Sequence, residues 1–242
     1  MTYAEKIIAE ADRINAEAEK VKGIYEAGAK SEYDLFWDNY QSNGTRTNYS
    51  YCFYTSNWTE KTFRPKYKLV PTNINNAFRN MNVPDFYNAC DLDTSKCTDV
   101  KFAFAGAGHK HIGIIDLSSC TGANTNGLFS GATNLRTVDK LIWNEHITTG
   151  DPFYNCSSLR NVVMEGTIAC NFQAFYSRSL SRASIESIIN TLSPTTGYTL
   201  TLSQVAVNSA FETAEGLKDG STSQEWEDLI ATKSNWTISL RN

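Results

Sequence analysis

His109 and His111 have the spacing that most suggests chemistry, because residues two apart on a β-strand point to the same face. Together they would supply two ligands to a metal ion, but a third ligand does not follow at a regular spacing. Asp91, Asp93 and Asp99 superficially suggest a calcium loop, yet the glycine and the closing glutamate of an EF-hand are missing. We therefore expect no metal ion and no cofactor.

Motifs for catalysis are equally scarce. The chain contains no Gly-x-Ser-x-Gly elbow, no Walker A loop and no paired Gly-rich dinucleotide motif. Glu225, Glu227 and Asp228 lie early in an expected helix, where negative charge suits the helix dipole, so we interpret them as structural. A glycan hydrolase would need a carboxylate pair in a groove, and no spacing argues for one. The sequence therefore predicts a protein that is not an enzyme.

The six cysteines are enough for three disulfides, but none of them forms a C-x-x-C pair. Cys156 stands at a position where the preceding repeat has Ala132, which indicates a small buried residue. A free cysteine packs readily at such a place. We therefore expect free, buried thiols rather than disulfides or a metal site at Cys52, Cys90, Cys97, Cys120, Cys156 and Cys170.

A phenylalanine recurs at intervals of 26, 25, 24 and 22 residues. This repeat indicates the elements that position the histidines, carboxylates and cysteines. Residues 128–138 and 152–162 align, and in both an aromatic is followed by a small residue, Leu, Arg and a branched apolar residue at the same offsets. A period of about 20–29 residues with a turn and a short strand is typical of a leucine-rich solenoid. The predicted repeat core consists of Phe78, Phe104, Phe129, Leu135, Val138, Phe153, Cys156, Leu159, Val162 and Phe175.

These repeats resemble a known family. The run LDTSKCTDVKFAFAGA (92–107), together with LFSGATNLRTV and FYNCSSLRNV, resembles the degenerate leucine-rich repeats of BspA-like bacterial surface proteins. The flanks at 31–49 and 63–73 and the C-terminal tail are similar to short repeat proteins encoded among tail genes of phages and prophages of gut Firmicutes. The resemblance covers nearly the whole chain, although the first and last repeats depart from the consensus. It implies a phage tail or baseplate appendage that binds the host surface.

Residues 3–27 carry a heptad pattern of apolar residues that ends at Gly28. The stripe is narrower than that of a helix docked on a globular core. One interpretation is an amphipathic helix lying against its own domain. We favour an intermolecular bundle, because the helix is long, terminal and thinly apolar, and the resemblance to tail appendages implies a homotrimer. The predicted oligomerisation residues are Ala4, Ile7, Ala11, Ile14, Ala18, Val21 and Tyr25.

We expect an α/β solenoid with four regions: an oligomerisation helix (1–30), an N-terminal cap with an aromatic cluster (31–75), leucine-rich repeats (76–180) and an α/β C-terminal cap (181–242). Aromatic residues at 49–67 would also suit stacking on sugar rings, but alternating aromatics usually belong to a core, which favours capping. Candidate serine caps predict helices at residues 184–190, 203–211 and 223–231 in the tail.

The strand at 159–164 predicts which side chains face a ligand. Period-two alternation points Val162 and Met164 inward and Val163 and Glu165 outward, and by alignment Asp139 also lies outward. Outward strand residues form the surface with which solenoids usually bind.

The insert at 141–147 adds two further candidates, Trp143 and His146. An alternative interpretation is that Trp143 fills the core between coils. The candidate ligand-binding residues are therefore Asp139, Trp143, His146, Val163 and Glu165.

Composition limits the partners. The net charge of −4 and the pI near 5.5 provide no basic field for nucleic acid. No apolar run approaches the roughly 20 residues that span a bilayer, and no apolar signal-peptide segment follows the N-terminus. We expect synthesis in a host cytoplasm and incorporation into a virion. The expected partners are further copies of the chain, other virion proteins, and a glycan or protein of the bacterial surface. The alternatives are a bacterial cell-surface adhesin, and a virion decoration or scaffold protein.

Overall fold

A computed structural model of the chain describes residues 13–19, 46–55, 62–63, 68–83, 85–86, 92–211 and 223–242. The chain divides into two units, residues 1–45 and 46–242, which are described separately. In the first unit, residues 13–19 are helical and exposed, with Ile14 56% exposed and Ala18 also accessible. The other predicted oligomerisation residues, Ala4, Ile7, Ala11, Val21 and Tyr25, lie outside the described residues.

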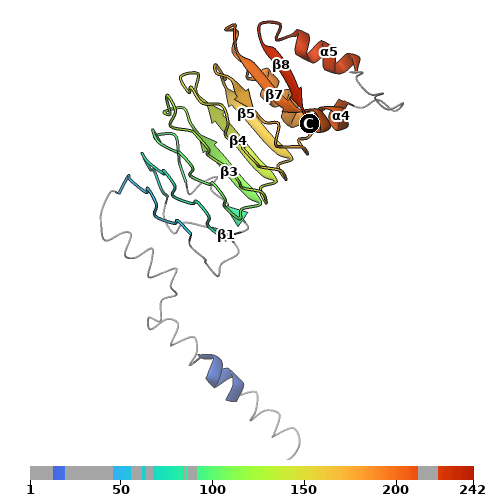
Figure 1. Ribbon diagram of the computed structural model, residues 1–242. Helices are drawn as coiled ribbons and strands as arrows, with labels where there is room; N and C mark the ends of the chain where they lie inside the picture. Colours follow the sequence, from blue (N-terminus) through green and yellow to red (C-terminus); the bar gives the residue numbers. More distant parts are fainter. Residues whose placement is uncertain are drawn as a thin grey trace, which may run out of the picture. The chain divides into compact units, whose positions relative to one another are not determined.

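The second unit is a β-solenoid of about four turns. Each turn adds one parallel strand beside the previous one, so the order in the five-stranded sheet follows the order in the chain (Figure 1). The strands are β1 (Thr62–Phe63), β2 (Asp85–Phe86), β3 (His111–Asp116), β4 (Thr137–Trp143) and β5 (Asn161–Gly166). Parallel strands require long connections. Here each connection runs back along the other side of the coil, through the turns described below.

A column of stacked phenylalanine rings forms the centre of the solenoid. The rings of Phe53, Phe78, Phe104, Phe129 and Phe153 follow one another at centroid separations of 5.0, 5.0, 5.6 and 5.6 Å, and all are buried. Leu135, Val138, Cys156, Leu159 and Val162 are buried around the column. The column begins one coil earlier than the sequence predicted, because Phe53, assigned to the N-terminal cap, stacks directly on Phe78.

The C-terminal end of the column requires a correction. Phe172 is fully buried and meets Phe153 edge to face at 6.3 Å and 76°, whereas the predicted Phe175 is only half-buried. The last interval is therefore 19 residues, and the shorter coil turns the ring out of the stack. Phe172 lies in strand β6, and the pleat points its side chain inward.

Turns on one side of each coil hold the column in place. Around the first four column phenylalanines, the residues two before and two after have positive φ: Tyr51 and Thr55, Asn76 and Asn80, Phe102 and Gly106, Gly127 and Gly131. In each case the phenylalanine N–H donates to a carbonyl of the next coil, for example Phe53 to Ala77 and Phe78 to Ala103, both at 2.8 Å. We call the turns at 51–55, 76–80, 102–106 and 127–131 the turn ladder. Because left-handed backbone costs about 1–2 kcal/mol per non-glycine residue, these hydrogen bonds must offset considerable strain.

Aspartate and asparagine side chains begin the first three turns. Asn48, Asn73 and Asp99 are bridged in parallel from coil to coil. Each accepts a hydrogen bond at Oδ1 from the backbone N–H two residues later, at 3.0, 2.8 and 3.1 Å. Such side chains favour turns for this reason. Residues 46–55 and 68–75, which the sequence assigned to a cap, thus have the same construction as the coils that follow.

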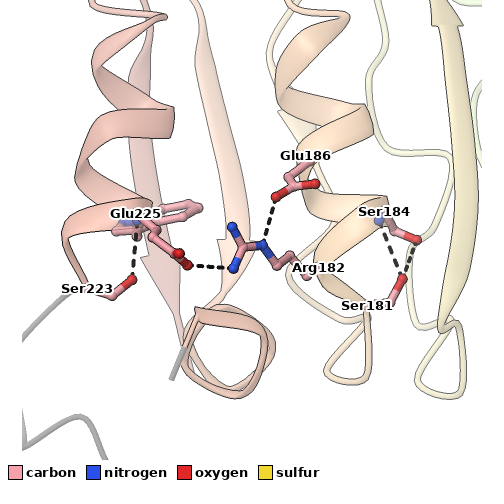
Figure 2. Close-up of polar contacts among 7 residues, drawn as sticks. Ser181, Arg182, Ser184, Glu186, Ser223 and Glu225 are labelled. Carbon is pink, nitrogen blue, oxygen red and sulfur yellow. Dashed lines mark hydrogen bonds and ion pairs between the residues drawn. The ribbon is translucent and has the colours of Figure 1, made fainter. Parts of the chain in front are cut away.

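After the last turn the chain forms a three-stranded parallel sheet with three helices. The elements are β6 (Phe172–Gln173), α3 (Arg182–Asn190), β7 (Thr199–Ser203), α4 (Gln204–Phe211), α5 (Gln224–Ala231) and β8 (Thr237–Arg241). The three helices overlap the segments that the sequence predicted. α5 begins at the predicted cap Ser223, whereas α3 is capped by Ser181 and begins two residues before the predicted range of 184–190 (Figure 2).

Arg182 connects two of these helices. Its Nε donates to Glu186 within α3 at 2.8 Å, and one terminal nitrogen donates to Glu225 of α5 at 2.5 Å (Figure 2). The guanidinium also lies 4.9 Å from the centre of the Phe211 ring at the end of α4. One side chain therefore contacts all three helices.

Candidate functional site

Six of the outward side chains of β3, β4 and β5 form what we call the sheet surface: His111, Ile114, Asp139, Lys140, Val163 and Glu165. Its layout depends on an irregularity in β4. Val138 pairs with Val162 and Leu141 pairs with Met164, so β4 has one more residue than β5 between these two pairs. Such a bulge changes the direction in which the side chains of the bulged strand point. As a result, Asp139 and Lys140 both stand opposite Val163.

Two diagonal ion pairs connect the three strands. His111 Nε2 lies 2.7 Å from Asp139 Oδ1, and Lys140 Nζ lies 2.6 Å from Glu165 Oε1. Val163 lies beside both pairs and is 48% exposed. Exposed ion pairs contribute only about 0–1 kcal/mol to stability. This combination of one exposed apolar side chain and paired charges is better suited to contacting a partner than to supporting the fold.

Three of the five residues predicted to bind a ligand, Asp139, Val163 and Glu165, therefore lie together on the sheet surface. His146 does not belong to it: this side chain is 70% exposed in the turn after β4, where its backbone N–H donates to Asn144 Oδ1 at 2.9 Å.

Trp143 requires a correction. It is only 2% exposed and packs edge to face on Phe172 at 5.4 Å. Its ring fills the core between coils, as the alternative interpretation had it, and cannot contact a ligand.

Three members of the sheet surface, His111, Ile114 and Lys140, were missing from the predicted set. Strict alternation from the buried Val138 would place Lys140 inside and Leu141 outside. The bulge reverses both, so Lys140 is half-exposed and Leu141 is buried. His111 was considered only as a metal ligand together with His109. The structure separates the two: His109 is fully buried, with Nδ1 2.6 Å from the Val83 carbonyl oxygen, and His111 lies on the sheet surface.

A shallow depression of about 500 Å³ adjoins the sheet surface between β5 and α3. It is lined by Met164, Glu165, Gly166, Ala183, Glu186, Ser187, Asn190 and Thr191. Its hydroxyl groups already have partners. Ser187 Oγ accepts a hydrogen bond from Met164 N–H at 2.7 Å, and Thr191 Oγ1 donates to the carbonyl of Ser187 at 3.1 Å. The first bond holds α3 against β5 and the second closes the last turn of α3, so the groups that line the depression already serve the packing of these elements.

Buried thiols and the buried histidine are poorly suited to chemistry. The described cysteines are free, and Cys90 lies outside the described residues. Burial raises the pKa of Cys120 and Cys156 to about 12 and that of Cys170 to about 11, so little thiolate is present at neutral pH. Burial also lowers the pKa of His109 to about 4, which keeps it neutral. Within the part of the chain that the structure describes, no three His, Cys, Asp or Glu side chains gather as a metal site would require.

A second exposed group, at the C-terminal end of the turn ladder, was also missed by sequence reasoning. Tyr154, Phe175 and Tyr176 form what we call the aromatic shelf. The rings of Tyr154 and Tyr176 are 4.6 Å apart at 63°, and those of Phe175 and Tyr176 are 4.0 Å apart at 33°. The signal was present in the sequence: Tyr154 follows a column phenylalanine directly, as Tyr54 does in the first coil.

The fold and its exposed surfaces define a β-solenoid with two candidate contact areas. No family model matches the chain, and searches of curated proteins and of solved structures returned no significant match. Among the described residues, no helix combines the length and apolar character needed to cross a membrane.

Proposed function

We propose that this protein is a structural protein of a phage virion, a tail or baseplate appendage that binds the bacterial host surface through its solenoid. The observation that carries the proposal is the sheet surface, where Val163 is exposed beside two pairs of ionisable side chains on hydrogen-bonded parallel strands. Preorganised strands lose little freedom on binding, which favours their use as a contact surface. The resemblance of the sequence to phage tail repeat proteins supplies the biological setting.

The finer architecture belongs to the same proposal. The coils are degenerate BspA-like leucine-rich repeats, the N-terminal helix forms a homotrimeric coiled coil, and α3 to β8 cap the end of the solenoid. The exposure of Ile14 within its helix supports a contact with another chain. Three linked copies of a surface that binds weakly reach a high overall affinity, although no individual site binds tightly.

The proposed role is binding, not catalysis. The ionisable side chains of the sheet surface contact one another in pairs, and the pKa values of the buried thiols are raised well above neutrality. A cofactor has no part in such a role.

Cell binding tests the proposal. Fluorescently labelled full-length protein is incubated with a panel of gut Firmicutes strains, and bound fluorescence is measured by flow cytometry. Val163→Glu places a third negative charge beside Asp139 and Glu165, and we expect it to weaken binding about tenfold. Val205 of α4 is equally exposed, at 48%, so Val205→Glu is a matched control that we expect to bind like the unaltered protein.

The outcomes separate the alternatives. If Val163→Glu binds as well as the control, the sheet surface is not the contact. If the unaltered protein binds no strain but binds purified virions that lack it, a decoration or scaffold role replaces receptor binding.

A further inference from the structure

The turn ladder ends at the aromatic shelf. Gly131 N–H donates to the carbonyl of Tyr154 at 2.8 Å, which is the last rung in this series. Beyond it, Phe172 meets Phe153 edge to face instead of stacking. The regular surface of the turns therefore breaks next to Tyr154, and side chains of the following coil, Phe175 and Tyr176, pack beside it.

The shelf leaves one ring open. The guanidinium of Arg241 lies 5.4 Å from the centre of the Phe175 ring, and Phe175 in turn packs against Tyr176. Tyr154, in contrast, is 45% exposed. An exposed tyrosine offers an apolar ring face beside a hydroxyl that both donates and accepts hydrogen bonds.

Polar groups surround this ring. The pKa of Tyr176 is raised, first by a hydrogen bond with the Tyr154 side chain and also by the negative charge of Asp151, while Arg241 opposes the shift. The charges of Asp151 and Arg241 thus both act on Tyr176, and the guanidinium of Arg241 lies over the adjoining Phe175 ring. Asp151 is half-buried, and its Oδ1 has no hydrogen-bond partner among the described residues. Burial raises the pKa of Asp151 as well.

We propose that the aromatic shelf binds a neutral pyranose ring of a bacterial surface polysaccharide, stacked on Tyr154 and hydrogen-bonded by Asp151, Arg241 and the tyrosine hydroxyls. An apolar ring face beside a carboxylate and a guanidinium matches a sugar, which has C–H groups on one face and hydroxyls at its edge. The charges of Asp151 and Arg241 cancel, which favours a neutral ligand. A nucleobase would also stack, but its phosphates find no basic field on a chain of net charge −4.

The inference rests on the proposed function in naming the class of surface ligand, but it uses a different part of the coil from the sheet surface. The two are therefore tested separately. Binding of the full-length protein to immobilised oligosaccharides of glucose, galactose, mannose and N-acetylglucosamine is measured by biolayer interferometry, and the cell assay is run in parallel.

We expect binding to at least one of these oligosaccharides at millimolar concentration or below. Tyr154→Ala should weaken it about tenfold, whereas Tyr154→Phe, which keeps the ring, should stay within about threefold. Asp151→Asn tests the same site without removing a ring and should weaken binding severalfold. Tyr54→Ala is the matched control, because Tyr54 is 40% exposed at the corresponding position of the first coil, and it should bind normally.

The inference is overturned if no oligosaccharide binds, if Tyr154→Ala and Asp151→Asn both bind normally, or if Tyr54→Ala loses as much as Tyr154→Ala. Binding to cells without binding to sugars would overturn the inference and leave the proposed function standing. Binding to sugars without binding to cells would overturn the proposed function and leave the inference standing.

Discussion

Ring stacking in the phenylalanine column should be measurable as a coupling energy. Phe104 is fully buried between Phe78 and Phe129, at centroid distances of 5.0 and 5.6 Å. Aromatic pairs contribute about 0.5–1.5 kcal/mol beyond the area that they bury. Phe104→Leu keeps an apolar side chain but loses both pairs, so we expect it to lower the free energy of unfolding by about 1–3 kcal/mol from stacking alone.

A double-mutant cycle isolates one pair. Phe78→Leu, Phe104→Leu and the double variant are compared by urea unfolding, followed by both tryptophan fluorescence and circular dichroism to check that the two transitions coincide. We expect a coupling of about 0.5–1.5 kcal/mol between these neighbours. Phe53 and Phe104 provide the control cycle, because they are two coils apart and stack only through Phe78. Their effects should add.

The result that would refute this reasoning is additivity for the Phe78–Phe104 pair, or an equal coupling for Phe53 and Phe104. In the first case the rings would act only as apolar volume. In the second case the structural effect of removing one ring would extend over more than one coil. The coupling energy would then report long-range cooperativity between coils instead of a direct contact.

Two further predictions concern backbone geometry and pH. Gly166 has φ +84°, and a Cβ there would meet the Trp143 carbonyl oxygen, whereas Gly122 at φ +62° faces open space. Gly166→Ala should therefore lower the urea midpoint clearly more than Gly122→Ala. The latter variant carries only the left-handed backbone penalty of about 1–2 kcal/mol. Equal decreases in the midpoint would contradict the clash at Gly166. The pKa of His109 falls from about 6.5 to about 4 on burial, so the unfolded state binds more protons between these values and stability drops as pH falls. From pH 7 to pH 5 the unaltered protein should lose about 2 kcal/mol more than His109→Gln, and parallel losses would show that another group titrates.

The repeat is visible in the sequence because each coil must bury the same positions. The spacing of Phe78, Phe104, Phe129 and Phe153 predicted a shared buried core, and period-two alternation placed the side chain of Val162 on the inward face of β5. Ser203 and Ser223 likewise predicted the starts of α4 and α5, because capping depends on residues within one turn of the helix, whereas α3 begins two residues before the predicted range, at the cap Ser181.

The remaining features depend on neighbouring coils. A phenylalanine is available at both 172 and 175, and only the shortened last coil selects Phe172 for the core. Whether Lys140 faces solvent is decided by the bulge against β5, and the burial of Trp143 by the presence of Phe172 above it.

Locally encoded properties of this protein were thus determined by its sequence: the period, the inward face of β5 and the starts of α4 and α5. The tertiary structure alone decided which side chains of different coils meet, namely the ion pairs of the sheet surface and the aromatic shelf. The physical reason is that these groups are separated by more than 20 residues in the chain and meet only when the coils stack in one register.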